Sequence, residues 1–233
     1  MRFFLLLLSL PAWLALPSAH AARSAFQARC EDGIPHAQVQ VTSRGAAGFT
    51  IDHTQSYRSL ARLKGQVPAR ALVLGLTRTE SRVAVRSTGA IVQDPASGYE
   101  CLAPRLAVEL WYTPAVIYVG REFGAGTCSY REILAHEQRH YLAYLSHLPG
   151  VERRVRAALQ QRFADRPLYA PRGQSSALLS AEIDARWLPY IKSELGQVER
   201  VQAAIDSPAE YARLSKVCAG EVQSIIRSQE GKR

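Results

Sequence analysis

Several features that mark specialised proteins are scarce or missing in this chain. Its 233 residues include only 15 Gly, 12 Pro and four Cys, which excludes a low-complexity or collagen-like chain. The cysteines form no Cys-x-x-Cys pair, which argues against a zinc knuckle or a redox couple. Beyond residue 22, no apolar run approaches the ~20 residues that a membrane-spanning helix needs. The sequence therefore predicts an ordinary globular protein without a stable membrane span.

Residues 1–21 have the pattern of an export signal. Arg2 is the only charged residue in this segment, residues 3–10 are almost wholly apolar, and residues 19–21 fit the small-x-small pattern that signal peptidase accepts. We therefore expect residues 1–21 to be a signal peptide and the mature chain, residues 22–233, to be secreted or periplasmic.

The four cysteines of an exported chain indicate two disulfides, because compartments outside the cytoplasm are oxidising. The sequence allows three pairings. We expect Cys101–Cys128 and Cys30–Cys218, of which the second would tie the N-terminal strand region to the last helix. Each bond would close a long loop and restrict the unfolded chain.

The net charge of +9 does not by itself indicate nucleic-acid binding. Arginines are scattered along the chain instead of alternating with aromatic residues. Their densest group, Arg153, Arg154 and Arg156, falls on the outer face of an expected helix. This pattern favours a solvated surface and no nucleic-acid partner, while attraction to anionic surfaces of the cell envelope stays open.

Periodicity divides the mature chain into a strand-rich half, residues 22–128, and a helical half, residues 129–233. A helix is expected at residues 56–64, ended by Gly65. We expect a single α+β domain in which a mostly antiparallel sheet packs against the helices. Alternation of apolar and polar residues predicts its strands at residues 37–41, 48–51, 71–76, 82–86, 106–112 and 115–119.

After Cys128 the pattern changes to long amphipathic segments, which predict helices. Ser129 and Glu132 form a capping-box pattern at the start of the first helix, which we expect to end at Pro149. The other helices are expected at residues 151–163, from residue 176 with a kink at Pro189, and from residue 207 through Cys218.

The first helix contains the sequence His136-Glu137-Gln138-Arg139-His140. Histidines four residues apart lie on one helix face, where both imidazoles can bind one Zn²⁺ ion, and Glu137 stands beside them. Zinc makes a water molecule acidic and polarises a carbonyl group, while the glutamate takes the proton of the water. The motif therefore predicts peptide-bond hydrolysis, with His136 and His140 as metal ligands and Glu137 as the general base.

His147 shares this helix face, but a rise of 1.5 Å per residue would place it about 10 Å beyond His140. That is too far for the same ion. The longer motif H-E-x-x-H-x-x-G-x-x-H breaks its helix at a glycine, whereas this chain has Ala143 there and Ser146 in place of the final histidine. We therefore interpret His147 as a helix-end histidine near the negative end of the dipole.

The third metal ligand is expected from the helix that starts near residue 176. Asp184 falls within its apolar face, where a buried carboxylate needs a cation or a metal. Glu182 lies nearer the opposite side, but a kinked helix weakens this argument from helical phase. We take Glu182 as the third ligand and Asp184 as the alternative. Asp206 and Glu210 are assigned to the capping pattern of the last helix.

Residues 133–141, Ile-Leu-Ala-His-Glu-Gln-Arg-His-Tyr, resemble the metal-binding helix of the zincin metalloproteases. More narrowly, they are similar to a bacterial family of predicted secreted zinc proteases whose helix reads close to His-Glu-Gln-Gly-His. Arg139 stands where that family usually has a small residue. The resemblance implies a zincin-like fold, zinc on His136 and His140, and Glu137 as the general base, and Glu182 is the ligand type familiar from gluzincins.

The sequence thus predicts an exported zinc peptidase that acts on protein or peptide substrates, with the stem peptides of peptidoglycan as one option. Four tyrosines could donate a hydrogen bond to the oxyanion, although we expect them to pack in the core: Tyr141, Tyr144, Tyr190 and Tyr211. The alternative function is a non-catalytic exported envelope or binding protein that keeps a vestigial or structural metal site.

Overall fold

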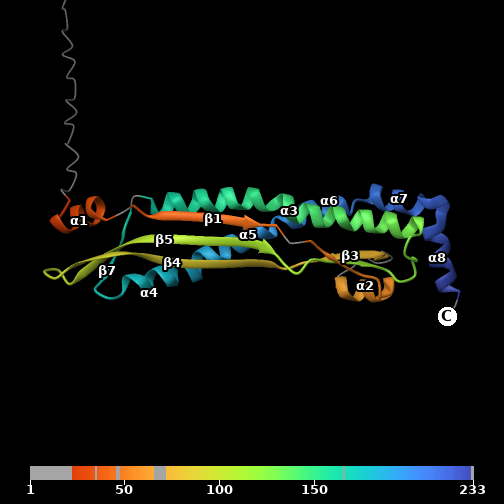
Figure 1. Ribbon diagram of the computed structural model, residues 1–233, viewed down its shortest axis with the longest axis horizontal. Helices are drawn as coiled ribbons and strands as arrows, with labels where there is room; N and C mark the ends of the chain where they lie inside the picture. The colour runs from red at the N-terminus through yellow and green to blue at the C-terminus, as the bar shows by residue number, and fades with distance from the viewer. Residues whose placement is uncertain (1–22, 35, 46–47, 66–71, 165, 232–233) are drawn as a thin grey trace, which may run out of the picture.

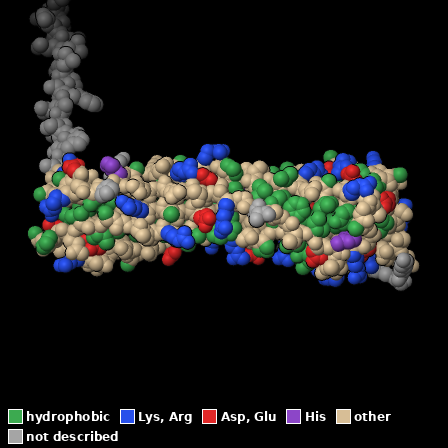
Figure 2. All heavy atoms as spheres, viewed as in Figure 1, with side chains coloured by type: hydrophobic (Ala, Val, Ile, Leu, Met, Phe, Trp, Pro, Cys, Tyr) green, Lys and Arg blue, Asp and Glu red, His purple; other side chains and the backbone are tan. Residues whose placement is uncertain are grey.

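The computed structural model describes residues 23–231 apart from 35, 46–47, 66–71 and 165, so the expected signal peptide lies outside the described part. The described residues form an elongated molecule in which one long helix, α3 (Cys128–Phe163), runs beside two separate β-sheets (Figure 1). Figure 2 shows charged side chains spread along the visible face of this rod. No helix of the described residues is both long and apolar enough to cross a membrane.

The larger sheet has β5 (Tyr99–Tyr112) at its centre. β5 pairs parallel with β1 (Gln38–Arg44) and antiparallel with β4 (Ser81–Asp94). Near its start, β5 also pairs antiparallel with β7 (Leu168–Pro171). We call these four strands the large sheet.

The small sheet has the strand order β2-β6-β3. Its central strand, β6 (Val116–Val119), pairs parallel with β2 (Thr50–Asp52) and antiparallel with β3 (Gly75–Arg78). The expectation of one mostly antiparallel sheet is therefore wrong. The protein has two mixed sheets, because the long connections that follow β1 and β2 allow them to lie parallel to their partners.

The predicted strands overlap β1 to β6, with residue 71 outside the described part. The predicted helix at residues 56–64 is α2 (Tyr57–Lys64), where the Ser56 hydroxyl accepts a hydrogen bond from the Ser59 N–H. The pattern missed α1 (Ala25–Gly33) and β7. Helices therefore also occur in the strand-rich half, and a strand occurs in the helical half.

Helix α3 connects two hydrophobic cores. Its N-terminal part buries Ile133 against the small sheet, where Ile117 and Val119 are fully buried. Its C-terminal part buries residues against the large sheet and the helices beyond it. Burial of each large aliphatic side chain stabilises a fold by about 1.5–3 kcal/mol, so both cores hold this helix in place.

The expectation of two helices separated at Pro149 is wrong, because α3 continues through this residue. A proline inside a helix loses one hydrogen bond and costs about 3 kcal/mol. Leu148 and Val151 lie on either side of the proline and are almost completely buried in the core beside the large sheet. Their burial, with that of Val155 and Leu159 further along, offsets the cost of the proline.

The expected capping box at Ser129 is also wrong. The N-cap of α3 is Thr127, whose hydroxyl accepts a hydrogen bond from the N–H of Tyr130 at 3.2 Å. The N–H of Ser129 donates instead to the carboxylate of Glu221 at 3.0 Å, and the Glu132 carboxylate accepts a hydrogen bond from Arg213. The first turn of α3 is thus capped partly by a residue far along the chain.

The helices after β7 are shorter than expected. The helix predicted from residue 176 is α4 (Ser175–Glu182), a π-helical turn η1 (Ile183–Trp187) and α5 (Leu188–Gly196), with Pro189 in the first turn of α5. Next comes α6 (Val198–Ile205). The helix predicted from residue 207 through Cys218 is α7 (Pro208–Lys216), which ends before Cys218. A 3-10 turn, η2 (Cys218–Gly220), separates it from α8 (Glu221–Glu230).

The disulfide pairing differs from the expected one. Cys30 of α1 is bonded to Cys101 of β5, and Cys128 is bonded to Cys218. Both expected pairs, Cys101–Cys128 and Cys30–Cys218, are therefore wrong. The reason is that α1 packs on β5, whereas the start of α3 lies beside the turn between α7 and α8. Two disulfides suit an oxidising environment outside the cytoplasm.

A buried carboxylate joins the large sheet to α4. Ser175, the first residue of α4, donates to Glu100 of β5 from its hydroxyl at 2.6 Å and from its N–H at 2.9 Å. These hydrogen bonds, led by that of the hydroxyl, lower the pKa of Glu100 to about 2.

This low pKa predicts an acid-sensitive contribution to stability. A carboxyl whose pKa falls from 4.5 to about 2 on folding stabilises the fold above pH 4.5, and the stabilisation is lost as the pH falls toward 2. We expect Glu100→Gln to lower the free energy of unfolding at pH 6 and to flatten its decline between pH 4.5 and 2. Urea unfolding at several pH values measures both effects. Glu80→Gln changes an exposed residue, and in this variant the free energy of unfolding should decline between pH 4.5 and 2 as it does in the wild type.

Candidate metal centre

The H-E-x-x-H sequence lies where α3, β3, α6 and α7 meet. A cavity of about 910 Å³ opens between these elements, and its lining includes His136, Glu137 and His140 together with Asp206. The two histidines and Glu137 are buried, with exposures of 5–8%. Residues from distant parts of the sequence thus share one cavity.

The two imidazoles and one carboxylate converge within this cavity. The Nε2 atoms of His136 and His140 lie 3.1 Å apart, and each lies 3.1 Å from Oδ1 of Asp206. Asp206 is the C-cap residue of α6. Its other carboxylate oxygen accepts a hydrogen bond from Lys64 at 3.0 Å.

Gln202 of α6 fixes the orientation of His140. The Gln202 side-chain nitrogen donates to the carbonyl oxygen of His140 at 3.2 Å, so its amide oxygen is the atom that faces Nδ1 of this imidazole. Nδ1 therefore carries the proton and donates to Gln202. In the neutral imidazole, Nε2 then presents a lone pair toward Asp206.

Glu210 of α7 lies against the outer nitrogen of the other imidazole. Its carboxylate is 3.2 Å from Nδ1 of His136, and Arg139 and Arg213 both bind this carboxylate. The hydrogen bond from Arg213 is the main cause that lowers the pKa of Glu210 to about 2. A carboxylate that accepts from Nδ1 orients a histidine that binds a metal, but the guanidinium of Arg139 also lies 2.9 Å from this Nδ1, so both a donor and an acceptor face it.

The electrostatics of the cluster favour a cation between its members. Burial opposes charge on His140, but its hydrogen bond with Asp206 and the nearby Glu137 raise its pKa. Burial likewise opposes charge on Asp206, but hydrogen bonds from His136, His140 and Lys64 lower its pKa. A lone pair and a carboxylate oxygen 3.1 Å apart repel each other unless a proton or a metal ion lies between them.

The three ligand atoms fit a divalent metal. His136, His140 and Asp206 each offer one ligand atom, and these atoms lie within 4.8 Å of one another. In a tetrahedral zinc site with bonds of roughly 2.0–2.1 Å, neighbouring ligand atoms are roughly 3.3 Å apart. The observed spacings of 3.1 Å need to widen by only a few tenths of an ångström.

Glu137 is held next to this cluster by the small sheet. The hydroxyl of Thr77 in β3 lies 2.9 Å from Oε2 of Glu137 and 2.9 Å from its carbonyl oxygen. Burial is the main cause that raises the pKa of Glu137, although the two neighbouring histidines oppose the shift. Gly75 also borders this carboxylate, since a Cβ atom there would lie 2.7 Å from both Cγ and Oε1 of Glu137.

The expected third ligands lie elsewhere. Both carboxylate oxygens of Glu182 accept hydrogen bonds from Arg162, at 2.9 and 2.8 Å, and Trp187 donates to one of them. Asp184 is exposed, contrary to its expected place on the apolar face, because the buried row of this helix is Leu179, Ile183 and Trp187, and Asp184 lies one position beyond that row. The structure brings Asp206 to the histidines in place of either residue.

His147 lies in the middle of α3, where its Nε2 donates to the carbonyl oxygen of Glu194, so it is not a helix-end residue. Tyr144 and Tyr211 line the cavity. Tyr141 packs against Phe49 in the core beside the small sheet.

Sequence reasoning missed Asp206 and Glu210 as neighbours of the histidines. Ser207 does cap α7, accepting a hydrogen bond from the Glu210 N–H, but the Glu210 side chain turns toward His136. No local signal marks these two residues, because Asp206 ends α6 whereas Glu210 lies in α7. Thr77 and Gly75 had no such signal, because only the fold brings β3 beside Glu137.

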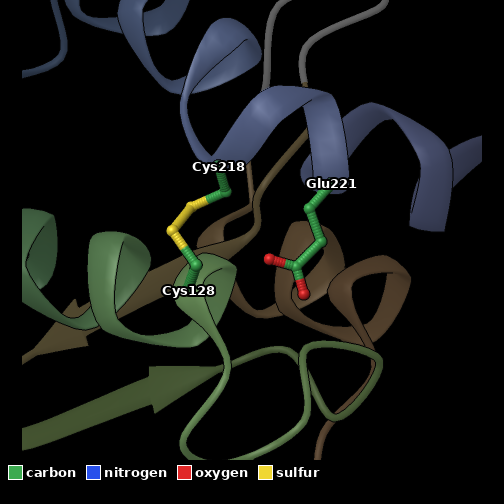
Figure 3. Close-up of side chains that lie close together, drawn as sticks. All are labelled: Cys128, Cys218 and Glu221. Atoms are coloured by element: carbon green, nitrogen blue, oxygen red, sulfur yellow. A yellow bond between two sulfur atoms is a disulfide. The ribbon is translucent and has the colours of Figure 1, made fainter.

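A second group of possible ligands has a different role. Figure 3 shows Cys128, Cys218 and Glu221 close together, with the two sulfur atoms bonded to each other. Glu221 caps the N–H of Ser129. The sulfurs of a disulfide are not thiolates and do not bind zinc, so this group joins α3 to the turn before α8.

Comparison with known proteins yields no relative: no family model, no curated protein and no solved structure matches this chain.

Proposed function

We propose that the protein is an exported zinc peptidase in which His136, His140 and Asp206 hold the metal. The observation that carries this proposal is the convergence of two Nε2 atoms and one carboxylate oxygen, each 3.1 Å from the others. Glu137 lies beside them in the same cavity. Asp206 takes the role that the sequence assigned to Glu182.

Zinc, when bound, supplies acidification of a water molecule and polarisation of the substrate carbonyl. Glu137 accepts the proton of the attacking water and later gives it to the leaving amine. Its raised pKa brings this carboxyl closer to neutral pH, which suits a group that must both accept and donate a proton. Thr77 holds Oε2 of this carboxylate in place, while Oε1 borders Gly75.

The arrangement of α3 and β3 supports a zincin-like architecture and a peptide substrate. Within the described residues, β3 pairs only with β6, so its other edge offers backbone groups beside the cavity. An extended peptide can pair with such an edge. Tyr144 and Tyr211 line the cavity, and in this proposal a hydroxyl of one of them donates a hydrogen bond to the substrate carbonyl. The substrates in this proposal are proteins or peptides, including the stem peptides of peptidoglycan.

Metal analysis and a hydrolysis assay test the proposal together. We expect the purified protein to contain about one zinc ion per chain, to cleave a casein or peptide-library substrate, and to lose activity when a chelator removes the metal. Readdition of zinc should restore it. Stoichiometric zinc without any hydrolysis would instead support a non-catalytic protein with a structural metal site, and absence of zinc would overturn both.

Gly75 gives a sharper test of how Glu137 is positioned. In Gly75→Ala the new methyl group would meet Glu137 at 2.7 Å and Ile133 at 2.8 Å, so the carboxylate has to move. Because a displacement of 1 Å can cost ~10²-fold in rate, we expect kcat/KM to fall by at least about tenfold. Zinc content should stay near one per chain. The measurements are kcat/KM, bound zinc and Tm.

Gly196→Ala is the matched control for this substitution, since a Cβ atom at Gly196 meets nothing within 4 Å. This variant should retain wild-type kcat/KM. Full activity in Gly75→Ala, at an unchanged Tm, would contradict the role of this close approach.

A further inference from the structure

The large sheet has one face buried and one face open. Along β5, Leu106, Val108 and Leu110 point into the core, while Arg105 and Ala107, which precede Leu106 and Val108, are exposed. At one end of the open face, α1 covers Cys101 through the disulfide from Cys30. Over the rest of this face no helix of the described residues packs; in Figure 1 the strands are seen with α5 behind them.

Strand register gathers arginines on this open face. Trp111 of β5 pairs with Arg82 of β4 on one side and with Arg44 of β1 on the other. Four and six residues further along β4 lie Arg86 and Thr88, and Thr88 pairs with Arg105. These positions share one face because side chains alternate along a strand. The arginines were scattered in the sequence and become neighbours only in the sheet.

The charges on this face are only partly balanced. Arg44 forms an ion pair with Glu109 at 3.1 Å, and Arg82 forms one with Glu80. Within the described part of the chain, Arg86 and Arg105 have no carboxylate within 4.0 Å. Both are exposed, and they are diagonal neighbours on adjacent strands. The middle of the face therefore carries two positive charges that are free to bind an anion.

The remaining side chains of the face suit a sugar. The Arg44 guanidinium stacks on one face of the Trp111 ring, 4.3 Å from its centre, and holds the indole in place, so a sugar ring has to pack on the other face. Sugar rings pack their C–H groups on such aromatic rings, while side-chain amides and hydroxyls bind their hydroxyl groups. Exposed side chains of these kinds lie in the same rows: Gln38, Gln40, Thr42 and Thr88.

We propose that the open face of the large sheet binds an acidic polysaccharide, with Arg86 and Arg105 contacting its carboxylates and Trp111 stacking on a sugar ring. From Arg82 to Thr88 the face extends about 20 Å at ~3.3 Å per residue, enough for several linked sugars. Guanidinium groups bind carboxylates in a bidentate manner. A nucleic acid is the less favoured polyanion, because Trp111 is the single aromatic side chain among these rows and successive bases call for several stacking platforms. This site is independent of the proposed peptidase activity.

Binding to polygalacturonate, a polymer of carboxylated sugars, tests the proposal with the purified protein. We expect retention on immobilised polygalacturonate that weakens with salt, no retention on neutral dextran, and a change in Trp fluorescence on addition of oligogalacturonate. The double substitution Arg86→Gln/Arg105→Gln should weaken oligogalacturonate binding at least tenfold. This variant should elute from immobilised polygalacturonate at a lower salt concentration than the wild type. In Trp111→Phe the ligand-dependent fluorescence change should disappear.

Arg153→Gln/Arg200→Gln removes the same charge from exposed positions on α3 and α6 and should bind within twofold of wild type. Equal weakening in this control would show that net charge alone drives binding, and would overturn the proposed site. Absence of saturable binding at low salt would overturn it as well, as would tighter binding to double-stranded DNA than to polygalacturonate. Circular dichroism of each variant verifies that it is folded.

Discussion

Asp206→Ala is expected to abolish stoichiometric zinc binding. The substitution removes one of three ligand atoms and leaves two imidazoles, which alone hold zinc weakly. Loss of a merely outer partner typically costs 10–100-fold in metal affinity, so loss of a direct ligand should cost more than ~100-fold. Competition against a chromophoric chelator measures this affinity. Asp206→Asn should fall between wild type and Asp206→Ala, because an amide oxygen is a weaker ligand without charge.

Glu182→Ala is the matched control, because it removes the carboxylate that the sequence predicted as the third ligand but that the fold places away from the histidines. Glu182 accepts two hydrogen bonds from Arg162, so its loss should lower Tm while zinc affinity stays at the wild-type value. The reverse outcome, with zinc lost in Glu182→Ala and kept in Asp206→Ala, would restore Glu182 as the third ligand and refute the cluster around Asp206.

Glu137→Gln should abolish hydrolysis and leave zinc in place. The amide has the size of the carboxylate and can keep the hydrogen bond from Thr77, but it cannot accept a proton. General acid–base catalysis contributes roughly 10²–10⁴-fold, so kcat should fall by at least the lower figure. Zinc per chain, kcat and KM are to be measured on one preparation.

Glu132→Gln changes the same type of residue on the same helix, at a position that binds Arg213 on the surface. This variant should keep wild-type kcat. If Glu137→Gln hydrolyses peptides at the wild-type rate, Glu137 is not the base. If Glu137→Gln loses both zinc and activity, the loss of zinc explains the loss of activity. In that case Glu137→Asp, which keeps the carboxylate, is the variant that tests the base.

Local patterns in the sequence predicted the parts of the site that lie on one element. The four-residue spacing of His136 and His140 places both on one face of a helix whatever surrounds it. The same holds for α2, whose start at Ser56 and end at Gly65 follow from capping preferences. Such features depend on residues three to four positions apart, so the sequence alone contains the relevant information.

The rest of the site depends on contacts between distant segments. Asp206 lies 66 positions from His140, and Thr77 lies 60 positions from Glu137. No local rule selects Asp206 over Glu182, because each is a carboxylate near a helix end. Tertiary packing also overrode local rules at Pro149, where burial of the flanking residues keeps α3 continuous.

The bond between Cys128 and Cys218 closes a covalent ring of the chain, with a sequence separation of 90 residues. His136, His140 and Asp206 all lie inside this ring. A protease that cuts once between α3 and α6 would therefore leave the fragments joined, with His136, His140 and Asp206 still in one covalently linked molecule. Nicked protein should migrate as one species without reductant and as two with it, and it should be able to rebuild its site after unfolding.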